Sequence, residues 1–214
     1  MNILTGNKNF INTFIHETKK LRNSIKSKDF LVLFSGGNTP KIFSKDLIEA
    51  IDNEHKDVIY SLTDERLVPM DSNLSNSQIF RDSQSFNFKS LCKRNGLLDK
   101  DNIDFISNIK PSISIVGFGL DGHTLSIFNH KEVPQKYLIT KKTDENFERV
   151  SFTIKYILQS ELIFLLANDK NKMNFLKKTI IEGIASPIGY LADCAQKNNK
   201  LFIVTGLKDN IKNV

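Results

Sequence analysis

One histidine of the chain lies in a loop rich in glycine. Residues 117–124 read GFGLDGHT, so His123 follows Asp121 by two positions. The imidazole group exchanges a proton near neutral pH, which makes His123 the natural general base here, with Asp121 able to orient its ring. The glycines let the backbone approach a ligand closely. This loop therefore predicts a site of proton transfer.

A second glycine-containing segment, residues 35–40 (SGGNTP), separates an apolar run from an amphipathic stretch. Gly36 and Gly37 allow backbone N–H groups to close on a ligand, and the start of a helix behind them favours an anion. The side-chain donors of the segment are Ser35, Asn38 and Thr39. We expect Thr39 to cap the helix and Pro40 to lie in its first turn. Because the segment matches neither a P-loop nor GxGxxG, it predicts binding of a phosphate group and not of a nucleotide.

Three consecutive charged residues, Asp64, Glu65 and Arg66, follow another apolar run. Charges at the end of a buried strand need partners or solvent. Arg66 is suited to contact a ligand oxygen, and Asp64 or Glu65 to orient a hydroxyl group or a histidine. The alternative for this triplet is a solvated loop with a local ion pair.

Short apolar runs alternate with longer amphipathic stretches, a pattern typical of βα units and a parallel sheet. Strands are predicted at residues 30–34, 58–62, 113–116, 162–167 and 201–204, and helices at residues 9–24, from Pro40 onward, at 169–181 and after Pro187. We expect residues 131–153 to be irregular, with short strands at 137–140 and 151–154. Each of the three segments described above follows a predicted strand, and open α/β sheets bind ligands outside the carboxyl ends of their strands. One site at that edge of the sheet is therefore expected.

The composition excludes several classes of protein. The 214 residues are 40% hydrophobic, which suffices for a buried core, and no apolar run reaches the roughly 18 residues of a membrane-spanning helix. Residues 1–8 are polar, so we expect no secretory leader. Cys92 and Cys194 lack CxxC spacing, which argues against a disulfide scaffold and a cysteine zinc site. We expect a single α/β domain over residues 1–214, located in the cytoplasm, with a mostly parallel sheet and helices on both faces.

The net charge of +6 does not indicate nucleic-acid binding, because the sequence has no dense basic stripe and no recognisable module. A mild positive field suits a small anion. Asp121 and His123 have no neighbouring cysteine or second histidine, so a metal site is not expected. A serine triad is not expected either, since GxSxG is absent.

Taken in order, the three segments resemble the 6-phosphogluconolactonase family, which carries SGG(S/T)TP, DERxVP…SN and GxGxDGHTxSLF. The matching residues are 35–40 (SGGNTP), 64–69 (DERLVP) with Ser75-Asn76, and 117–128 (GFGLDGHTLSIF). The resemblance implies a modified Rossmann-like fold and hydrolysis of 6-phosphoglucono-1,5-lactone to 6-phosphogluconate, a step of the oxidative pentose phosphate pathway. It implies no metal and no organic cofactor. The chain departs from the pattern at Asn38, where the family has Ser or Thr, and lacks the proline after Phe128.

The resemblance also implies roles for individual residues. His123 matches the general base that activates water, and Arg66 matches a substrate-contacting arginine. Arg149, in residues 146–152 (NFERVSF), matches the phosphate-binding arginine of a PPxRxT segment, although the prolines are absent. Lys170 and Lys172 both fit a phosphate-binding lysine, and Lys170 is favoured. The expected catalytic set is thus His123, Asp121, Asp64 and Arg66, and the expected substrate-binding set is Ser35, Gly36, Gly37, Asn38, Thr39, Arg149 and Lys170.

Two other functions remain open. Glucosamine-6-phosphate deaminases share the DGH loop, but residues 124–128 (TLSIF) follow the lactonase pattern. A non-catalytic sugar-phosphate-binding domain is the other alternative, and the presence of both His123 and Arg66 argues against it. The expected partner is a small phosphorylated sugar lactone, not a nucleic acid or a membrane, and the expected state is a monomer or a weak homo-oligomer.

Overall fold

A computed structural model describes most of the chain. It covers residues 2–25, 29–53, 55, 57–80, 87–129, 133–183, 185–198 and 200–206, without the side chains of residues 38, 39, 41 and 42. Within these residues, no helix has both the length and the apolar character needed to cross a membrane.

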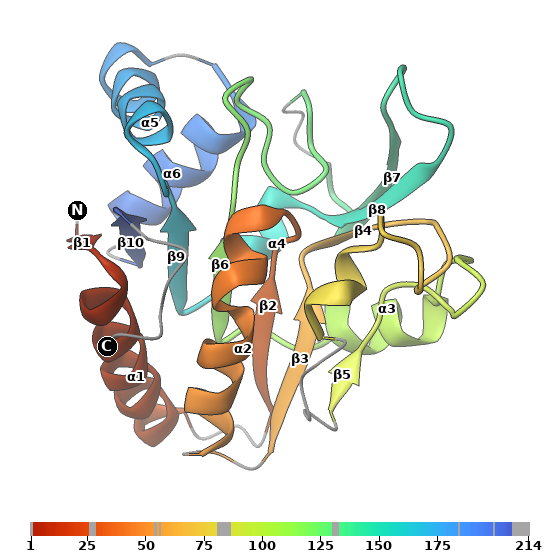
Figure 1. Ribbon diagram of the computed structural model, residues 1–214, viewed down its shortest axis with the longest axis horizontal. Coiled ribbons are helices and arrows are strands. Elements are labelled where there is room, and N and C mark those ends of the chain that lie inside the picture. The colour runs from red at the N-terminus through yellow and green to blue at the C-terminus, as the bar shows by residue number, and fades with distance from the viewer. Residues whose placement is uncertain are drawn as a thin grey trace.

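A seven-stranded sheet forms the centre of the molecule, and all its neighbouring strands run parallel (Figure 1). Its strands, in spatial order, are β1 (Asn2–Thr5), β10 (Leu201–Thr205), β9 (Leu162–Leu166), β6 (Ile113–Val116), β2 (Phe30–Phe34), β3 (Val58–Leu62) and β5 (Phe88–Lys89). Every residue of β2, β3 and β6 is buried, as expected for continuous apolar runs covered on both faces. The predicted α/β class and mostly parallel sheet are confirmed.

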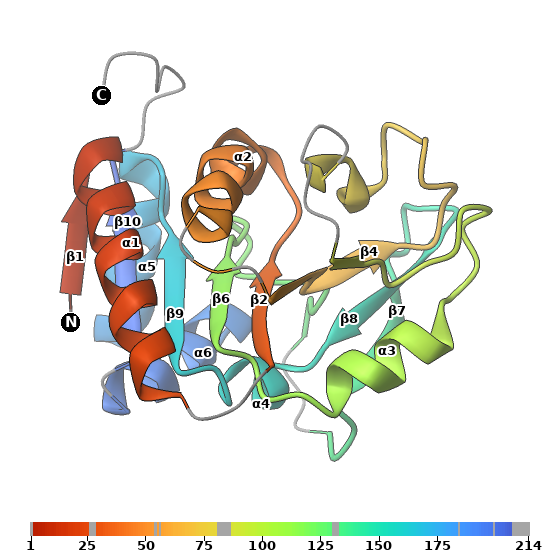
Figure 2. The ribbon, with the colours of Figure 1, turned by 90° about the horizontal axis from the view of Figure 1, so that it is seen from below.

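A second, three-stranded antiparallel sheet lies beside the carboxyl edge of the first (Figures 1 and 2). Its strands, in spatial order, are β4 (Asp64–Arg66), β8 (Glu148–Phe152) and β7 (Tyr137–Lys141). Thr63 links the two sheets, since its N–H donates to the carbonyl of Phe34 and its carbonyl accepts from the N–H of Phe152. The charged triplet 64–66 therefore forms a strand, not the solvated loop considered as an alternative.

Helices cover both faces of the parallel sheet. They are α1 (Asn7–Ser24), α2 (Asn38–Asp52), α3 (Lys100–Ser107), α4 (Ile154–Ile157), α5 (Lys170–Glu182) and α6 (Pro187–Lys197), with a 3₁₀ helix at Asn76–Phe80. Figure 2 shows α2 on one face and α4 and α6 on the other.

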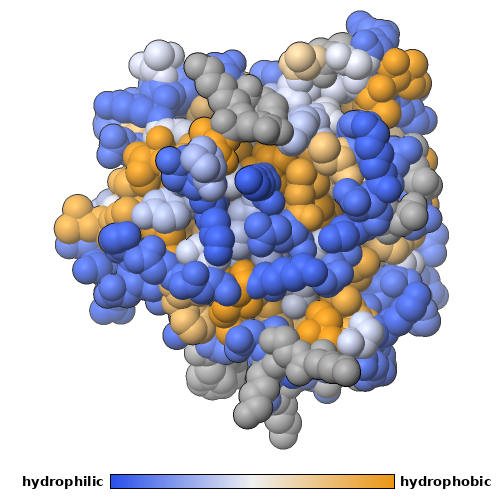
Figure 3. Space-filling view, turned by 180° about the vertical axis from the view of Figure 1, so that it is seen from behind, coloured by the Kyte–Doolittle hydropathy of each residue, from blue (hydrophilic) through white to orange (hydrophobic). Residues whose placement is uncertain are grey.

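The helices bury apolar side chains that recur at helical spacing. Phe43, Leu47 and Ile51 of α2 follow one another every four residues and are each only 1% exposed. They belong to one cluster of buried apolar side chains from the helices and the strands. The face of the molecule shown in Figure 3 is mostly hydrophilic, with hydrophobic side chains in separate patches. Burial of this cluster accounts for most of the stability that holds the site-bearing loops in place.

Some local expectations need correction. Gly37, not Thr39, is the N-cap of α2, and the helix begins at Asn38, so Thr39 already lies inside it. The segment 131–153 is more regular than expected, since β7 and β8 occupy much of its described part. Of the strand predicted at residues 151–154, only the first two residues belong to β8, which ends at Phe152; Thr153 caps α4 and Ile154 begins it. Sequence patterns did not predict β1, β5, α3 or α4.

Candidate functional site

A cavity of about 350 Å³ opens at the carboxyl edge of the parallel sheet. Its lining residues are Ser35, Gly36, Gly37, Pro40, Asp64, Arg66, Asn76, Gly117, Phe118, Gly119, His123, Leu125, Arg149, Asp169 and Lys172. The three segments singled out in the sequence thus meet in one place, together with β8 and the start of α5. The side chains of Asn38 and Thr39, both expected in the site, lie outside the described structure.

The loop after β2 brings backbone groups to the cavity. Ser35 is buried, and its Oγ accepts a 2.7 Å hydrogen bond from the N–H of Gly117, which joins this loop to the loop after β6. A Cβ on Gly36 would lie 2.0 Å from the amide oxygen of Asn76, so any larger residue would displace the Asn76 side chain. Gly36 and Gly37 line the cavity directly before the first turn of α2, where unpaired N–H groups favour an anion.

The loop after β6 presents His123. Its Nδ1 lies 2.5 Å from Oδ1 of Asp121, and the His123 side chain is 34% exposed. A Cβ on Gly119 would lie within 2.5 Å of both side chains, so glycine at this position makes their pairing possible. Partial burial acts to raise the pKa of Asp121, but the hydrogen bond and charge of His123 outweigh it and lower that pKa. With Nδ1 held by Asp121, Nε2 is the ring atom left to exchange a proton with a ligand or water.

Asp64, the first residue of β4, carries a buried carboxylate on the cavity wall. It is 4% exposed. Its Oδ1 accepts a 2.8 Å hydrogen bond from the hydroxyl of Thr63, and its Oδ2 accepts one of 2.7 Å from the hydroxyl of Ser126. Its orientation is therefore fixed by neighbours from two different segments.

Glu65, the next residue, is not among the lining residues of the cavity and is fully buried. Its two carboxylate oxygens accept five hydrogen bonds, from the N–H groups of Arg66, Asn76 and Ser77 and from the hydroxyls of Ser75 and Ser77. Burial raises the pKa of Glu65, although the hydrogen bonds oppose the change. Glu65 thereby anchors the segment that brings Asn76 to the cavity, a role that the sequence pattern did not distinguish from that of Asp64.

Two guanidinium groups lie on neighbouring strands, because Arg66 of β4 and Arg149 of β8 are paired in register. Arg66 donates from Nη1 to the carbonyl of Leu74 at 2.6 Å, and its buried Nε has no hydrogen-bond partner in the described part of the chain. Arg149 is 8% exposed and forms a two-pronged ion pair with Glu145, with Nε–Oε2 at 2.9 Å and Nη2–Oε1 at 2.5 Å. Both arginines line the cavity, which makes this wall suited to bind an anion.

The two candidate lysines are placed differently at the start of α5. Lys172 is half-buried and lines the cavity, with its Nζ 5.4 Å from the ring centre of Phe118. Burial lowers the pKa of Lys172, and the charge of Asp169 opposes this shift. Lys170 is exposed and does not belong to the lining residues of the cavity. The geometry therefore favours Lys172, although Lys170 was preferred from the sequence.

Several residues at the cavity were given no role in the sequence analysis. Ser126 connects Asp64 to Arg149, whose Nη1 lies 3.5 Å from its hydroxyl. Leu125 lines the cavity with a positive φ of 57°, a conformation that apolar side chains rarely adopt. Glu145 has no sequence signal beyond its spacing of four residues from Arg149. Within the described residues, no group of three or more His, Cys, Asp or Glu side chains is arranged to hold a metal ion.

Comparison with known proteins places these features in a family. The sequence model of the family described as glucosamine-6-phosphate isomerases/6-phosphogluconolactonase matches residues 10–90 and 99–201. A 6-phosphogluconolactonase of Helicobacter pylori strain J99 is 29% identical over 168 residues, which cover 71% of this chain and 72% of that protein.

Solved structures of the family share the fold. A crystal structure of 6-phosphogluconolactonase from Thermotoga maritima superimposes with a TM-score of 0.73 at 20% identity, covering 97% of this chain and 99% of the other. A monomeric glucosamine-6-phosphate deaminase superimposes with a TM-score of 0.69 at 16% identity, covering 98% of each chain. The fold alone thus does not separate the two activities. Because the family model matches most of the sequence, including every segment that lines the cavity, the chain belongs to the glucosamine-6-phosphate isomerase/6-phosphogluconolactonase family.

Proposed function

We propose that this protein hydrolyses 6-phosphoglucono-1,5-lactone to 6-phosphogluconate, a step of the oxidative pentose phosphate pathway. The observation that carries the proposal is a cavity lined by His123 together with three cationic side chains, Arg66, Arg149 and Lys172. A histidine supplies proton transfer and the cations supply binding of a phosphorylated substrate. The sequence-matched relative from Helicobacter pylori is named 6-phosphogluconolactonase, which supports the same assignment.

In the proposed reaction, Nε2 of His123 accepts a proton from a water molecule as the water oxygen attacks C1 of the lactone. The bond between C1 and the ring oxygen then breaks, and the proton held by His123 passes to that oxygen as it becomes a hydroxyl group. Asp121 keeps the imidazole oriented through its contact with Nδ1. These steps use only water and side chains of this protein.

Negative charge develops on the C1 oxygen during the attack and needs nearby donors. The backbone N–H groups of Gly36 and Gly37 and the guanidinium of Arg66 border the same cavity and suit this role. Asp64, held by Thr63 and Ser126, is suited to accept a hydrogen bond from a substrate hydroxyl.

Arg149 and Lys172 are the proposed ligands of the 6-phosphate. They reach the cavity from two different elements, β8 and α5. Binding energy from this remote group can align C1 with the attacking water. Lys170, the lysine favoured from the sequence, is not needed in this arrangement.

The test is to generate 6-phosphoglucono-1,5-lactone in situ and to follow its disappearance with and without the protein. Acceleration above the uncatalysed rate is the expected result. Loss at the uncatalysed rate would contradict the proposal. Ammonia release from glucosamine 6-phosphate, measured in parallel, would instead support the deaminase activity of the same family.

The proposed setting is the cytoplasm. The cysteines Cys92 and Cys194 are unpaired, which fits a reducing compartment. Fractionation of cells with an antibody against the protein would test this location.

A further inference from the structure

Arg149 is held on its outer edge by Glu145. The carboxylate contacts Nε at 2.9 Å and Nη2 at 2.5 Å, and the side chains of Arg149 and Glu145 are only 10% and 20% exposed. A two-pronged pair of this kind fixes the plane of the guanidinium as well as its position.

Aromatic rings restrict the guanidinium further. The Cζ atom of Arg149 lies 5.4 Å from the ring centre of Phe147 and 5.7 Å from that of Phe128. Phe128 also lies 5.3 Å from the ring of His123, so it touches both the proposed base and the proposed phosphate ligand. Contacts between a cation and an aromatic ring add to the attraction that holds the arginine in place.

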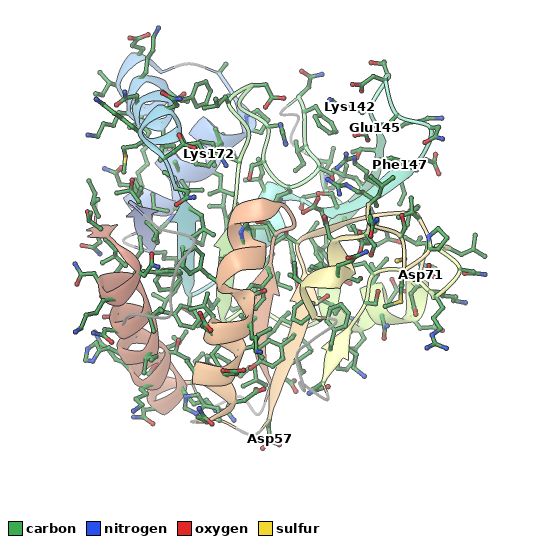
Figure 4. The ribbon with its side chains drawn as sticks, in the orientation of Figure 1. Asp57, Asp71, Lys142, Glu145, Phe147 and Lys172 are labelled. Atoms are coloured by element: carbon green, nitrogen blue, oxygen red, sulfur yellow. The ribbon has the colours of Figure 1, made fainter. Side chains whose placement is uncertain are left out.

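Glu145 and Phe147 belong to the connection between β7 and β8. Figure 4 shows the two side chains together on this connection, on the same upper side of the molecule as Lys172 of α5. The N–H of Glu145 donates to the carbonyl of Lys142 at 3.2 Å, which closes a turn within the connection. The connection therefore carries the groups that orient Arg149 and is itself tied by a local hydrogen bond.

Arg149 lines the cavity, and Nη1 is the guanidinium nitrogen that takes no part in its two hydrogen bonds to Glu145. Its Nη1 lies 3.5 Å from the hydroxyl of Ser126, which is a weak contact, and Ser126 in turn binds Asp64 on the cavity wall. Arg66 lies next to Arg149 in register, and the two positive charges repel one another. Glu145, which is not among the lining residues of the cavity, offsets this repulsion through its ion pair with Arg149.

We infer that Glu145 is a positioning residue that holds Arg149 with Nη1 facing the cavity, ready to bind the phosphate of the substrate. This inference rests on the proposed function for the identity of the substrate. The rival interpretation is that the carboxylate competes with the phosphate for the same guanidinium. The two interpretations predict opposite signs, because removing a positioning residue weakens anion binding, whereas removing a competitor strengthens it.

The test compares Glu145→Gln with Glu148→Gln. Glu148 lies three residues further along, is exposed, and removes the same charge when replaced. For Glu145→Gln we expect a rise in KM for the phosphorylated lactone of about tenfold with little change in kcat, and a matching loss of affinity for inorganic phosphate in a calorimetric titration. Glu148→Gln should behave as the unmodified protein, and Glu145→Asp, which keeps the charge, should recover part of the lost affinity.

Each result has a defined meaning. Unchanged or tighter phosphate binding by Glu145→Gln would overturn the inference, as would failure of the unmodified protein to bind phosphate at all. If the unmodified protein binds phosphate but does not hydrolyse the lactone, the proposed function fails, and the phosphate titration still decides the role of Glu145. Thermal unfolding of each variant separates loss of anion binding from loss of the folded state.

Discussion

The cavity has two walls that are built differently. Segments that follow parallel strands supply the first wall, which includes backbone N–H groups, the side chain of Lys172 and the side chain of His123, which is 34% exposed. Antiparallel strands β4 and β8 supply the second wall, with Asp64 4% exposed and Arg149 8% exposed. In the described part of the chain, His123 pairs with the side chain of Asp121, whereas Arg149 pairs with Glu145 through two contacts, lies beside two aromatic rings and contacts Ser126 only weakly.

This difference matches the two tasks proposed for the walls. A general base must reach water and change its protonation state, so partial exposure and few partners suit it. An anion-binding arginine keeps its charge throughout, and it loses less entropy on binding when its geometry is fixed beforehand. We therefore expect replacement of His123 to lower kcat and replacement of Arg149 to raise KM.

The largest effect is expected for His123→Ala. General-base catalysis contributes about 100- to 10,000-fold in rate, so kcat should fall within that range while KM changes little. Steady-state kinetics with the phosphorylated lactone measure both constants. His16→Ala, at an exposed position of α1, is the matched control and should leave both unchanged. An unaltered kcat for His123→Ala would remove the proposed base and with it the contrast between the walls.

Arg149→Ala is expected to change mainly KM. A hydrogen bond to a charged group contributes about 1.5–3 kcal/mol, so KM should rise about 10- to 100-fold, with a smaller effect on kcat. Arg149→Lys keeps the charge but lacks the two-pronged guanidinium that engages Glu145. Its KM should lie between those of the unmodified protein and Arg149→Ala. A loss confined to kcat would mean that Arg149 serves the reacting carbonyl and not the phosphate.

The two walls also differ in how far the sequence predicts them. Buried parallel strands such as Phe30–Phe34 are continuous apolar runs, and their ends mark where the loops must lie. The three-residue strand β4 consists only of charged residues, and nothing local shows that Glu65 is buried, since most of its donors lie at residues 75–77. The resemblance located Arg149, but its partner Glu145 depends on the conformation of the connection between β7 and β8.

The choice between the lysines shows the same limit. Residues two positions apart on an α-helix point about 200° apart around its axis, so Lys170 and Lys172 cannot both face the cavity. Which one does is set by where α5 starts. Asp169 is the N-cap and accepts a 2.8 Å hydrogen bond from the N–H of Lys172. The sequence indicated the helix but not the direction of each side chain.

Lys172→Ala compared with Lys170→Ala sharpens the description of the binding site. Loss of one charged contact to the phosphate should raise KM about tenfold for Lys172→Ala, whereas Lys170→Ala should leave it unchanged. The two variants remove the same charge from the same helix, so the overall field of the protein cancels in the comparison. The reverse result would restore Lys170 as the phosphate ligand and place the bound substrate nearer the outer end of α5.

The smallest effect on the reaction is expected at Glu65, which tests the support of the strand wall. In Glu65→Gln, one carboxylate oxygen becomes an amide group that faces N–H donors, and leaving a buried donor unpaired costs about 1–3 kcal/mol of stability. Because burial raises the pKa of Glu65, the folded protein binds its proton more readily than the unfolded chain. The stabilisation from this proton is complete below the ordinary glutamate pKa and is lost as pH rises through the raised value.

The stability difference between the unmodified protein and Glu65→Gln should therefore be larger near pH 5 than near pH 8. Denaturant unfolding at both pH values measures it, because subtraction removes the contribution of all other titrating groups. Glu148→Gln, which removes an exposed carboxylate from the neighbouring strand, should show a smaller and flatter difference. A difference for Glu65→Gln that does not vary with pH would mean that five hydrogen bonds hold the carboxylate charged as readily as water does. In that case burial would not be the dominant influence on the protonation of Glu65, which anchors the segment that brings Asn76 to the cavity.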